Sequence, residues 1–528
     1  MELPWAGQTR SGAKAAGFFL LVFAVQVAVF HFIDPLGSQD TIRYLNFADF
    51  LQSPHTVHFG DLGYNNGLLF TPLFLPCLLA FFKKIAGLPY IATGIALEFI
   101  SFQMVVWLTY AIALRIDGKR TAGLAVALLL TNLAFCLHSA FILTEYPFMA
   151  VLLLTLLYII STRTISSKRS FILSLLFGFL VSIRVQGFLF ILFIVIYLLY
   201  SGRARLRQIL ILCSIPAAYL LFYICTYLYM DHRFPQTITA NEIFSLNVFF
   251  LGDNFAGYDF TLHGVEALAV RKASFYMAWL DPKTYLSLIA MRSADLFKYL
   301  STGQVFYSLF LGALALLAII FSRVREKTFL TCLILFNFSM IIFSPVHYDS
   351  LLRYQGILFP LVIILIASSF VHGDEDDAGR GRRRPVLLFA VLLYLAYFVV
   401  RHYDFFQATY ADKYNRGMLL RREAIDSARL ISNEIGHDHN AVASDPLQYN
   451  MIYRSGNMPV YFFEGWERRA IVDYFTIRDI RYLVAKYGVI DRLKRKGVPV
   501  GIVSQFPPGD GRAGRLFLCE WKDGGSYR

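Results

Sequence analysis

The sequence predicts an all-α polytopic membrane domain over residues 1–401, followed by a small extracytoplasmic α/β domain over residues 402–528. Of the 528 residues, 57% are hydrophobic and 16% are charged, and the mean hydropathy is +0.54. Soluble domains usually carry about 25% charged residues, so the composition points to a membrane protein. The net charge of +13 is spread over short basic clusters between apolar runs. That pattern is typical of cytoplasmic loops and predicts no nucleic-acid partner.

Apolar runs long enough to cross a bilayer, at about 20 residues each, predict about eleven spans. The first run follows Arg10 and Lys14, like the core of a signal peptide. No small-x-small cleavage site follows it, so we expect an uncleaved span. The expected spans cover residues 15–33, 90–113, 121–140, 146–161, 169–184, 186–201, 209–229, 304–321, 328–345, 354–371 and 385–400.

Two apolar runs are ambiguous, and each affects the orientation of all later spans. Leu68 to Phe82 could be a span or a helix that dips in from one face, and Ser170 to Tyr200 could be one long helix or a hairpin broken at Arg184. A re-entrant helix and a hairpin together place all the basic clusters on the side of the N-terminus, as the positive-inside rule requires. We therefore expect a multi-pass plasma (inner) membrane protein with a cytoplasmic N-terminus and an extracytoplasmic C-terminal domain.

After Arg401 the sequence loses its long apolar runs. Met418 to Ile435 has helical periodicity, and four short apolar runs alternate with further helical stretches, which predicts a mainly parallel sheet with helices. These runs are 441–443, 460–462, 482–484 and 498–503. Neither a glycine-rich phosphate loop nor a nucleophile elbow is present, and the six cysteines form no zinc-binding pattern.

Asp40 is the first candidate catalytic acid. It lies at the expected outer end of the first span, just before an amphipathic stretch in which Tyr44, Leu45, Ala48 and Leu51 share a helix face. An acid beside a span is costly and indicates function, although Asp also caps helices well.

Glu145 is the second candidate acid, between two apolar runs at the expected outer end of the third span. A solvated Glu at a helix start, with Thr144 as its cap and Pro147 in its first turn, would also explain the pattern. The functional interpretation requires Asp40 and Glu145 to converge on one face of the membrane.

Two arginines interrupt apolar runs on the same predicted side. Arg184 lies at the expected hairpin, and Arg353 opens a late span in the sequence from His347 to Tyr354. Either side chain could extend to lipid headgroups, or it could bind a substrate phosphate, for which the guanidinium geometry is well suited.

Five motifs occur in order along the chain: Gly37-Ser38-Gln39-Asp40, Tyr64 to Phe70, Thr144-Glu145-Tyr146-Pro147, Ser182 to Gly187, and Arg353-Tyr354 with Pro360. In order and topology they resemble the C-type glycosyltransferase superfamily, in particular the bacterial relatives of protein O-mannosyltransferases and of the lipid A aminoarabinose transferase. Two departures are visible. Gln39-Asp40-Thr41 stands where the family commonly has an Asp-Glu pair, and Asn65-Asn66 stands where it has two prolines.

The resemblance implies transfer of a sugar from a polyprenyl-phosphate donor to a protein, lipid or glycan acceptor at the outer face of the lipid bilayer. It implies Asp40 as general base, with Glu145 orienting the acceptor or sharing that role. Donor phosphate or sugar contacts would come from the side chains of Arg184, Arg353, Tyr64, His347 and Asp34. The resemblance identifies no cofactor with certainty, and Asp34, Asp40 and Glu145 could together hold a divalent metal.

Two other functions remain open at this point. A polysaccharide polymerase or ligase shares the topology and substrate type, but a ligase is expected to depend on basic outer-loop residues rather than on an acid. A transporter or flippase for a lipid-linked sugar usually shows internal repeats with interrupted helices, and the sequence shows no such repeat.

Overall fold

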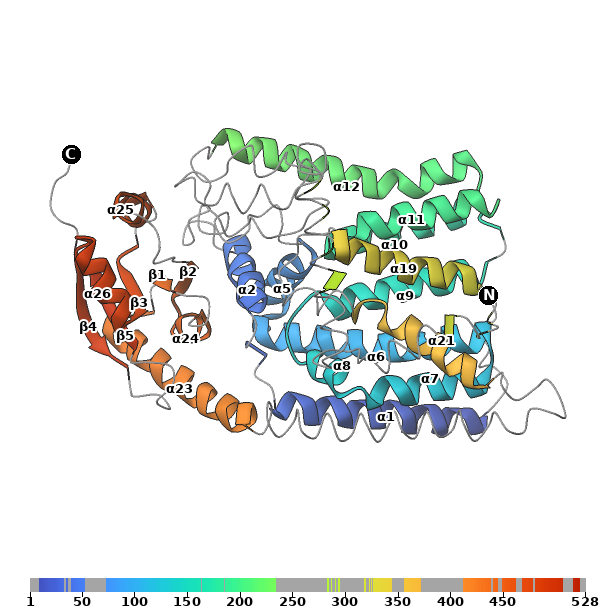
Figure 1. Cartoon of the computed structure of the whole chain (residues 1–528), viewed down its shortest axis with the longest axis horizontal. Coiled ribbons are helices and arrows are strands. Elements are labelled where there is room, and N and C mark those ends of the chain that lie inside the picture. The colour runs from blue at the N-terminus through green and yellow to red at the C-terminus, as the bar shows by residue number, and fades with distance from the viewer. Residues whose placement is uncertain are drawn as a thin grey trace.

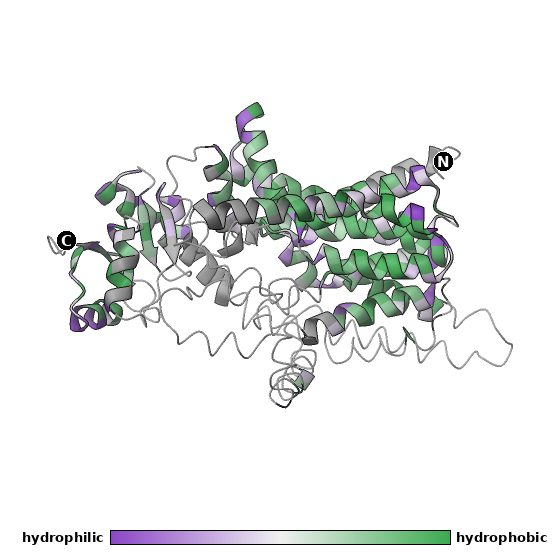
Figure 2. Ribbon diagram, turned by 90° about the horizontal axis from the view of Figure 1, so that it is seen from above, coloured by the Kyte–Doolittle hydropathy of each residue, from purple (hydrophilic) through white to green (hydrophobic). Residues whose placement is uncertain are grey.

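The computed structural model consists of a long helical bundle with a small α/β unit at the end opposite the N-terminus (Figure 1). Hydrophobic residues fill the bundle, whereas hydrophilic residues gather at helix ends and in the α/β unit (Figure 2). The structure describes residues 9–32, 35–36, 39–52, 73–162, 164–184, 186–233, 326–343, 356–371, 412–437, 440–444, 449–461, 468–477, 480–506 and 516–522, with single positions between 283 and 324.

The described bundle helices follow the predicted apolar runs closely. They are α1 (Thr9–Phe32), α2 (Gln39–Gln52), α5 (Phe74–Ala86), α6 (Tyr90–Ile116), α7 (Lys119–Thr131), α8 (Leu133–His138), α9 (Glu145–Ile160), α10 (Ser167–Ile183), α11 (Gly187–Tyr200), α12 (Leu206–Arg233), α19 (Lys327–Phe343) and α21 (Phe359–Val371). Among the described residues, α6 alone is long and apolar enough to cross a membrane by length and composition, and several shorter apolar helices surround it. The predicted spans 304–321 and 385–400 lie almost wholly outside the described residues, so the expected number of spans stays a prediction.

The predicted span 121–140 is two helices rather than one. Asn132 separates α7 from α8, and its side-chain oxygen accepts a hydrogen bond from the backbone N–H of Phe135 at 2.9 Å. A side chain that caps a helix in this way favours a new helix start over continuation of the previous helix. The uninterrupted span is therefore wrong at this position.

The predicted hairpin at Arg184 is confirmed. The helices α10 and α11 are separate and meet at a tight connection. A Cβ atom at Gly187 would lie 2.8 Å from the backbone carbon and oxygen of Leu180, so only glycine allows the start of α11 to approach α10 this closely.

The described part of the run Leu68 to Phe82 forms the start of α5, a helix of 13 residues that ends at the left-handed Gly87. At about 1.5 Å per residue this helix spans about 20 Å, which is less than the hydrocarbon thickness of about 30 Å. It packs against α2 rather than running the length of the bundle (Figure 1). This agrees with a helix that enters from one side.

The loops of the bundle gather at two opposite ends. At the end near the N-terminus, Arg203 forms an ion pair with Glu326, which also accepts a hydrogen bond from the Tyr197 hydroxyl at 2.6 Å. The backbone N–H of Ile165 donates to the Arg203 carbonyl at 2.9 Å in the same region. The basic loops 164–169, 203–207 and 326–327 therefore share one end, and the hairpin at Arg184 lies at the other.

The C-terminal α/β unit contains a five-stranded sheet of order β2-β1-β3-β5-β4. Its elements are α23 (Asp412–Ile435), β1 (Ala441–Ser444), α24 (Tyr449–Arg454), β2 (Met458–Tyr461), α25 (Arg468–Ile477), β3 (Tyr482–Lys486), α26 (Tyr487–Arg495), β4 (Val500–Gln505) and β5 (Leu516–Trp521). The strands β2, β1 and β3 are parallel, whereas β5 is antiparallel to both β3 and β4. The predicted mainly parallel sheet is therefore found in two of the four strand pairings, and the two antiparallel pairings both involve β5, which the prediction omitted.

The α/β unit contacts the bundle through α24. Tyr453 packs against a cluster that includes Tyr44 and Leu45 of α2 and Leu75 of α5. Burial, together with the nearby Asp49 carboxylate, raises the pKa of the Tyr453 hydroxyl well above its usual value. The proposed boundary between residues 401 and 402 lies outside the described residues.

Cysteine labelling tests the orientation. We expect Gly118→Cys and Gly381→Cys to react only from the cytoplasmic side, and Phe255→Cys and Asn450→Cys only from outside, in a variant that lacks the native cysteines. Gly118 joins α6 to α7 at the N-terminal end of the bundle, and Asn450 lies in the first turn of α24 at the other end (Figure 1). Labelling of position 255 from the cytoplasmic side would contradict the orientation.

A pH series tests the packing of the sheet. Burial raises the pKa of the Cys519 thiol from 9.0 to about 11, partly offset by Lys494. Folding therefore disfavours the thiolate. The stability that the buried neutral thiol contributes is complete below pH 9 and is lost as the pH rises toward 11. We expect Cys519→Val to reduce the loss of stability between pH 9 and 11, measured by denaturant unfolding of the full chain. Parallel curves for the two proteins would contradict this.

Candidate active site

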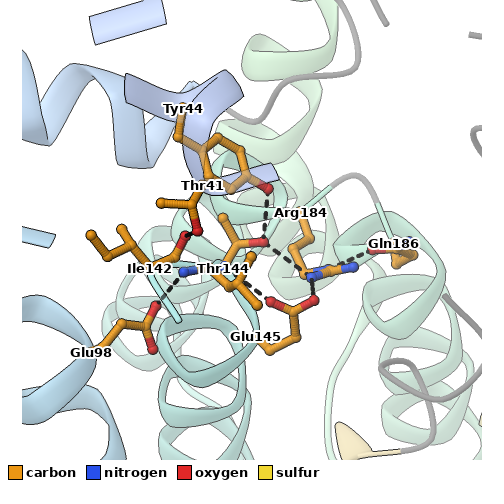
Figure 3. Close-up of polar contacts among 9 residues, drawn as sticks. Thr41, Tyr44, Glu98, Ile142, Thr144, Glu145, Arg184 and Gln186 are labelled. Atoms are coloured by element: carbon orange, nitrogen blue, oxygen red, sulfur yellow. Dashed lines mark hydrogen bonds and ion pairs between the residues drawn. The ribbon is translucent and has the colours of Figure 1, made fainter. Parts of the chain in front are cut away.

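The candidate site lies at the end of the bundle that carries the α/β unit. The N-terminal half of α2, the segment before α9 and the hairpin between α10 and α11 meet there (Figure 3). Each of these three elements carries one motif that the sequence analysis singled out. The structure brings into contact Tyr44 and Thr144, which are 100 residues apart, and Thr144 and Arg184, which are 40 residues apart.

Glu145 and Arg184 form a buried ion pair. The Arg184 Nη1 atom lies 2.8 Å from Glu145 Oε1, and the exposed fractions of the two side chains are 7% and 1% (Figure 3). Glu145 opens α9, where the helix dipole favours a negative charge. The interpretation of Glu145 as a solvated helix start is wrong, because its carboxylate is enclosed by protein.

The Arg184 guanidinium makes two further hydrogen bonds that fix its plane. Nη1 donates to Thr144 Oγ1 at 3.0 Å, and Nε donates to Gln186 Oε1 at 2.9 Å. Arg184 is the last residue before the hairpin turn and Gln186 is the residue before α11, so the hairpin itself orients the charge. Arg184 does not extend outward to solvent, which contradicts the interpretation that it reaches for lipid headgroups.

Thr144 connects the ion pair to α2. It occupies the cap position of α9, but its hydroxyl makes no capping bond, which corrects the expected capping role. The hydroxyl instead accepts from Arg184 and lies 3.4 Å from the Tyr44 hydroxyl. The Thr144 backbone N–H donates to Glu145 Oε2 at 3.1 Å, so both carboxylate oxygens are engaged.

Asp40 lies in the first turn of α2, which begins at Gln39. The structure describes the backbone at Asp40 and not its side chain. The neighbouring residue Thr41 is fully buried and donates from Oγ1 to the Ile142 carbonyl at 2.9 Å (Figure 3). The first turn of α2 therefore contacts the segment that leads into Glu145. The convergence of the Asp40 and Glu145 carboxylates stays a prediction.

The shared face expected for α2 is found in three of its four residues. Tyr44, Leu45 and Ala48 are buried, whereas Leu51 is 41% exposed. Leu51 lies beside Gln52, where α2 ends, so the packed face stops short of the C-terminus of the helix.

Glu98 is a buried acid that the sequence analysis missed. It lies inside the predicted span 90–113, is fully buried, and accepts a hydrogen bond from the Leu143 backbone N–H at 2.9 Å. The general rule that ionisable residues inside apolar spans indicate a special role would have found it.

The remaining predicted site residues, Asp34, Tyr64, His347 and Arg353, lie outside the described residues. Within the described residues, no group of three or more His, Cys, Asp or Glu side chains is arranged to hold a metal ion.

Neither a protein-family model nor a curated protein sequence matches this chain. Solved structures do match it. The structure of ArnT from Cupriavidus metallidurans bound to undecaprenyl phosphate is similar with a TM-score of 0.57 at 12% identity, covering 97% of this chain and 99% of that chain. The apo structure of the same protein gives a TM-score of 0.55 at 13% identity, covering 96% and 98%.

The chain has the C-type glycosyltransferase fold. The arabinofuranosyltransferase AftD from Mycobacteria shares this fold with a TM-score of 0.51 at 12% identity, and the match covers 96% of this chain and 40% of that one. The structural neighbours with this fold are multi-pass membrane proteins with a C-terminal domain, which agrees with the membrane class predicted from the sequence. The fold also corresponds to the resemblance inferred from the five motifs.

Proposed function

We propose that the protein is a membrane glycosyltransferase that moves a sugar from a polyprenyl-phosphate donor to an acceptor at the outer face of the membrane. One observation carries the proposal: the fold matches, over nearly the full length of both chains, a structure solved with undecaprenyl phosphate. The buried charged cluster of Glu145 and Arg184 at one end of the bundle supplies groups suited to this chemistry.

In the proposed reaction an acceptor hydroxyl or amine attacks the anomeric carbon of the donor sugar. The new bond forms as the bond from that carbon to the phosphate oxygen breaks, and polyprenyl phosphate leaves with the bonding electron pair. The Asp40 carboxylate takes the proton that the acceptor loses. Phosphate is a good leaving group, so no strong general acid is needed.

Arg184 and Glu145 have complementary roles in this proposal. A fixed guanidinium stabilises the negative charge that develops on the leaving phosphate without having to reorient during the reaction. Glu145 keeps Arg184 in place through the buried ion pair. Its role in orienting the acceptor is proposed on the motif resemblance alone. Four further residues are proposed as contacts to the polyprenyl-phosphate sugar donor on the motif resemblance alone: Arg353, Tyr64, His347 and Asp34.

The proposed arrangement in the cell follows the loop charges. The bundle end near the N-terminus carries the basic loops and faces the cytoplasm, so the site and the C-terminal unit face outward. We assign residues 1–401 to the membrane domain and 402–528 to the extracytoplasmic domain, as the sequence predicts.

Release of undecaprenyl phosphate tests the proposal whatever the sugar and the acceptor are. The purified protein would be placed in phosphatidylethanolamine/phosphatidylglycerol vesicles with undecaprenyl-phosphate donors carrying a hexose, a pentose or an amino sugar. Protein, lipid and glycan fractions of the cell envelope would supply acceptors. We expect one donor to be consumed, with free undecaprenyl phosphate detected by mass spectrometry.

Two other outcomes would contradict the proposal. Movement of an intact donor across the vesicle membrane would indicate a transporter instead. If no donor is consumed and undecaprenyl phosphate fails to raise the melting temperature of the protein, a polyprenyl-phosphate enzyme is excluded.

A further inference from the structure

Glu98 is a buried carboxyl group that takes no part in the proposed reaction. It is fully buried within α6, the apolar helix long enough to cross a membrane. Burying a carboxyl group is costly unless hydrogen bonds offset the loss of water. Its Oε1 atom accepts the Leu143 backbone N–H at 2.9 Å (Figure 3). Such a costly residue in an apolar helix requires an explanation.

Gly94 lies one turn before Glu98, on the same face of α6. A Cβ atom at position 94 would lie 2.6 Å from Cγ2 and 2.9 Å from Cδ1 of Ile142, which is fully buried. Any larger residue at position 94 would push Ile142 away. Two positions one turn apart on α6 therefore contact this segment: Gly94 leaves room for Ile142, and Glu98 binds the backbone of Leu143.

The same segment is held from the opposite side by α2. Thr41 donates from Oγ1 to the Ile142 carbonyl at 2.9 Å. Residues 142–143 are thus fixed between two helices, and the next two residues are Thr144 and Glu145, which bind Arg184.

We propose that Glu98 and Gly94 position the segment 142–144 and thereby set the placement of Glu145 and Arg184 in the active site. Glu98 is a positioning residue that acts through the Leu143 N–H, and it needs an acceptor oxygen rather than a negative charge. The inference rests on the proposed function, since it concerns the placement of the groups that would act in that reaction. A shift of about 1 Å at reacting groups can lower turnover about 10²-fold.

Two substitutions of Glu98 test this proposal. Glu98→Gln keeps the acceptor oxygen and should retain kcat within about 3-fold, whereas Glu98→Leu removes it and should lower kcat by about 10²-fold. KM for the donor should change by less than about 3-fold in both variants, because no donor contact is removed. Loss of activity in Glu98→Gln equal to that in Glu98→Leu would overturn the proposal. So would full activity in Glu98→Leu.

Substitutions at Gly94 test the same positioning role without changing a charged residue. Gly94→Ala should lower kcat by about 10-fold or more, and adding Ile142→Ala should restore most of the loss, because it removes the atoms that collide. Gly123→Ala in α7 is the matched control, since a Cβ atom there meets nothing within 4 Å. Failure of Ile142→Ala to rescue Gly94→Ala would count against the proposal.

Hydrogen exchange separates failure of this inference from failure of the proposed function. Peptides covering residues 139–146 should exchange faster in Glu98→Leu than in Glu98→Gln or the wild type, whether or not a substrate is found. If exchange is unchanged, the positioning role is wrong. If exchange rises as expected but the wild type transfers no sugar, the proposed function is wrong instead.

Discussion

Asp40→Asn is expected to lower turnover by about 10²–10⁴-fold while donor binding is largely retained. Asparagine keeps the size and the hydrogen-bonding oxygen of aspartate but cannot accept the proton of the attacking group. The structure places Asp40 in the first turn of α2, next to Thr41, which contacts the segment leading into Glu145. The measurement is kcat for release of undecaprenyl phosphate, together with the Kd for donor.

The same substitution separates catalysis from a purely structural role. Asparagine and aspartate cap helix N-termini about equally well. If Asp40 merely stabilised the start of α2, the protein would therefore tolerate the change. Asp117→Asn is a suitable control, because Asp117 lies at the other end of the bundle and accepts from Thr121 Oγ1 at 2.6 Å. Near-normal turnover in Asp40→Asn would end the assignment of a general base.

The second large effect concerns the buried ion pair. Arg184→Met should lower the free energy of unfolding by about 3–5 kcal/mol, because it leaves the Glu145 carboxylate buried without its cation. Adding Glu145→Gln should recover most of this loss, since the double variant buries no unpaired charge. The free energy of unfolding of both variants is measured by thermal unfolding of the full chain in detergent. The single and the double variant should both be inactive if Arg184 stabilises the leaving phosphate.

An exposed ion pair in the same chain provides the comparison. Arg495 and Asp491 are 2.6 Å apart, with side chains 72% and 49% exposed. Arg495→Met should change stability by less than about 1 kcal/mol, as is usual for surface pairs. If Arg184→Met has an equally small effect, the pair does not stabilise the site.

The features that follow from local sequence were predictable. The hairpin at Arg184 was predicted because the charge pattern on either side of it has only one consistent arrangement. The first turn of α2 and the position of Glu145 at a helix start also follow from apolar runs and helix-start signals near Asp40 and Pro147. These signals lie within a few residues of the feature that they predict.

The partners of the site residues could not be predicted in the same way. Thr144 has the sequence position of a helix cap, and only the fold shows that its hydroxyl binds Arg184, which lies 40 residues later. The break at Asn132 lies inside an apolar run that is long enough for one span, so a single capping hydrogen bond overrides the length rule. Strand β5 was missed because its cross-strand partners, rather than its own short sequence, define it.

The contact between Tyr453 and α2 limits which pieces of this protein can be exchanged. Because the same helix carries Asp40 in its first turn and supports α24 with its packed face, the outer unit and α2 must fit each other. A chimera that takes its C-terminal unit from a relative of the same fold should therefore assemble only when α2 comes from that relative too. Substitutions at Tyr453 and on the facing side of α2 are accordingly expected to change together among natural homologues.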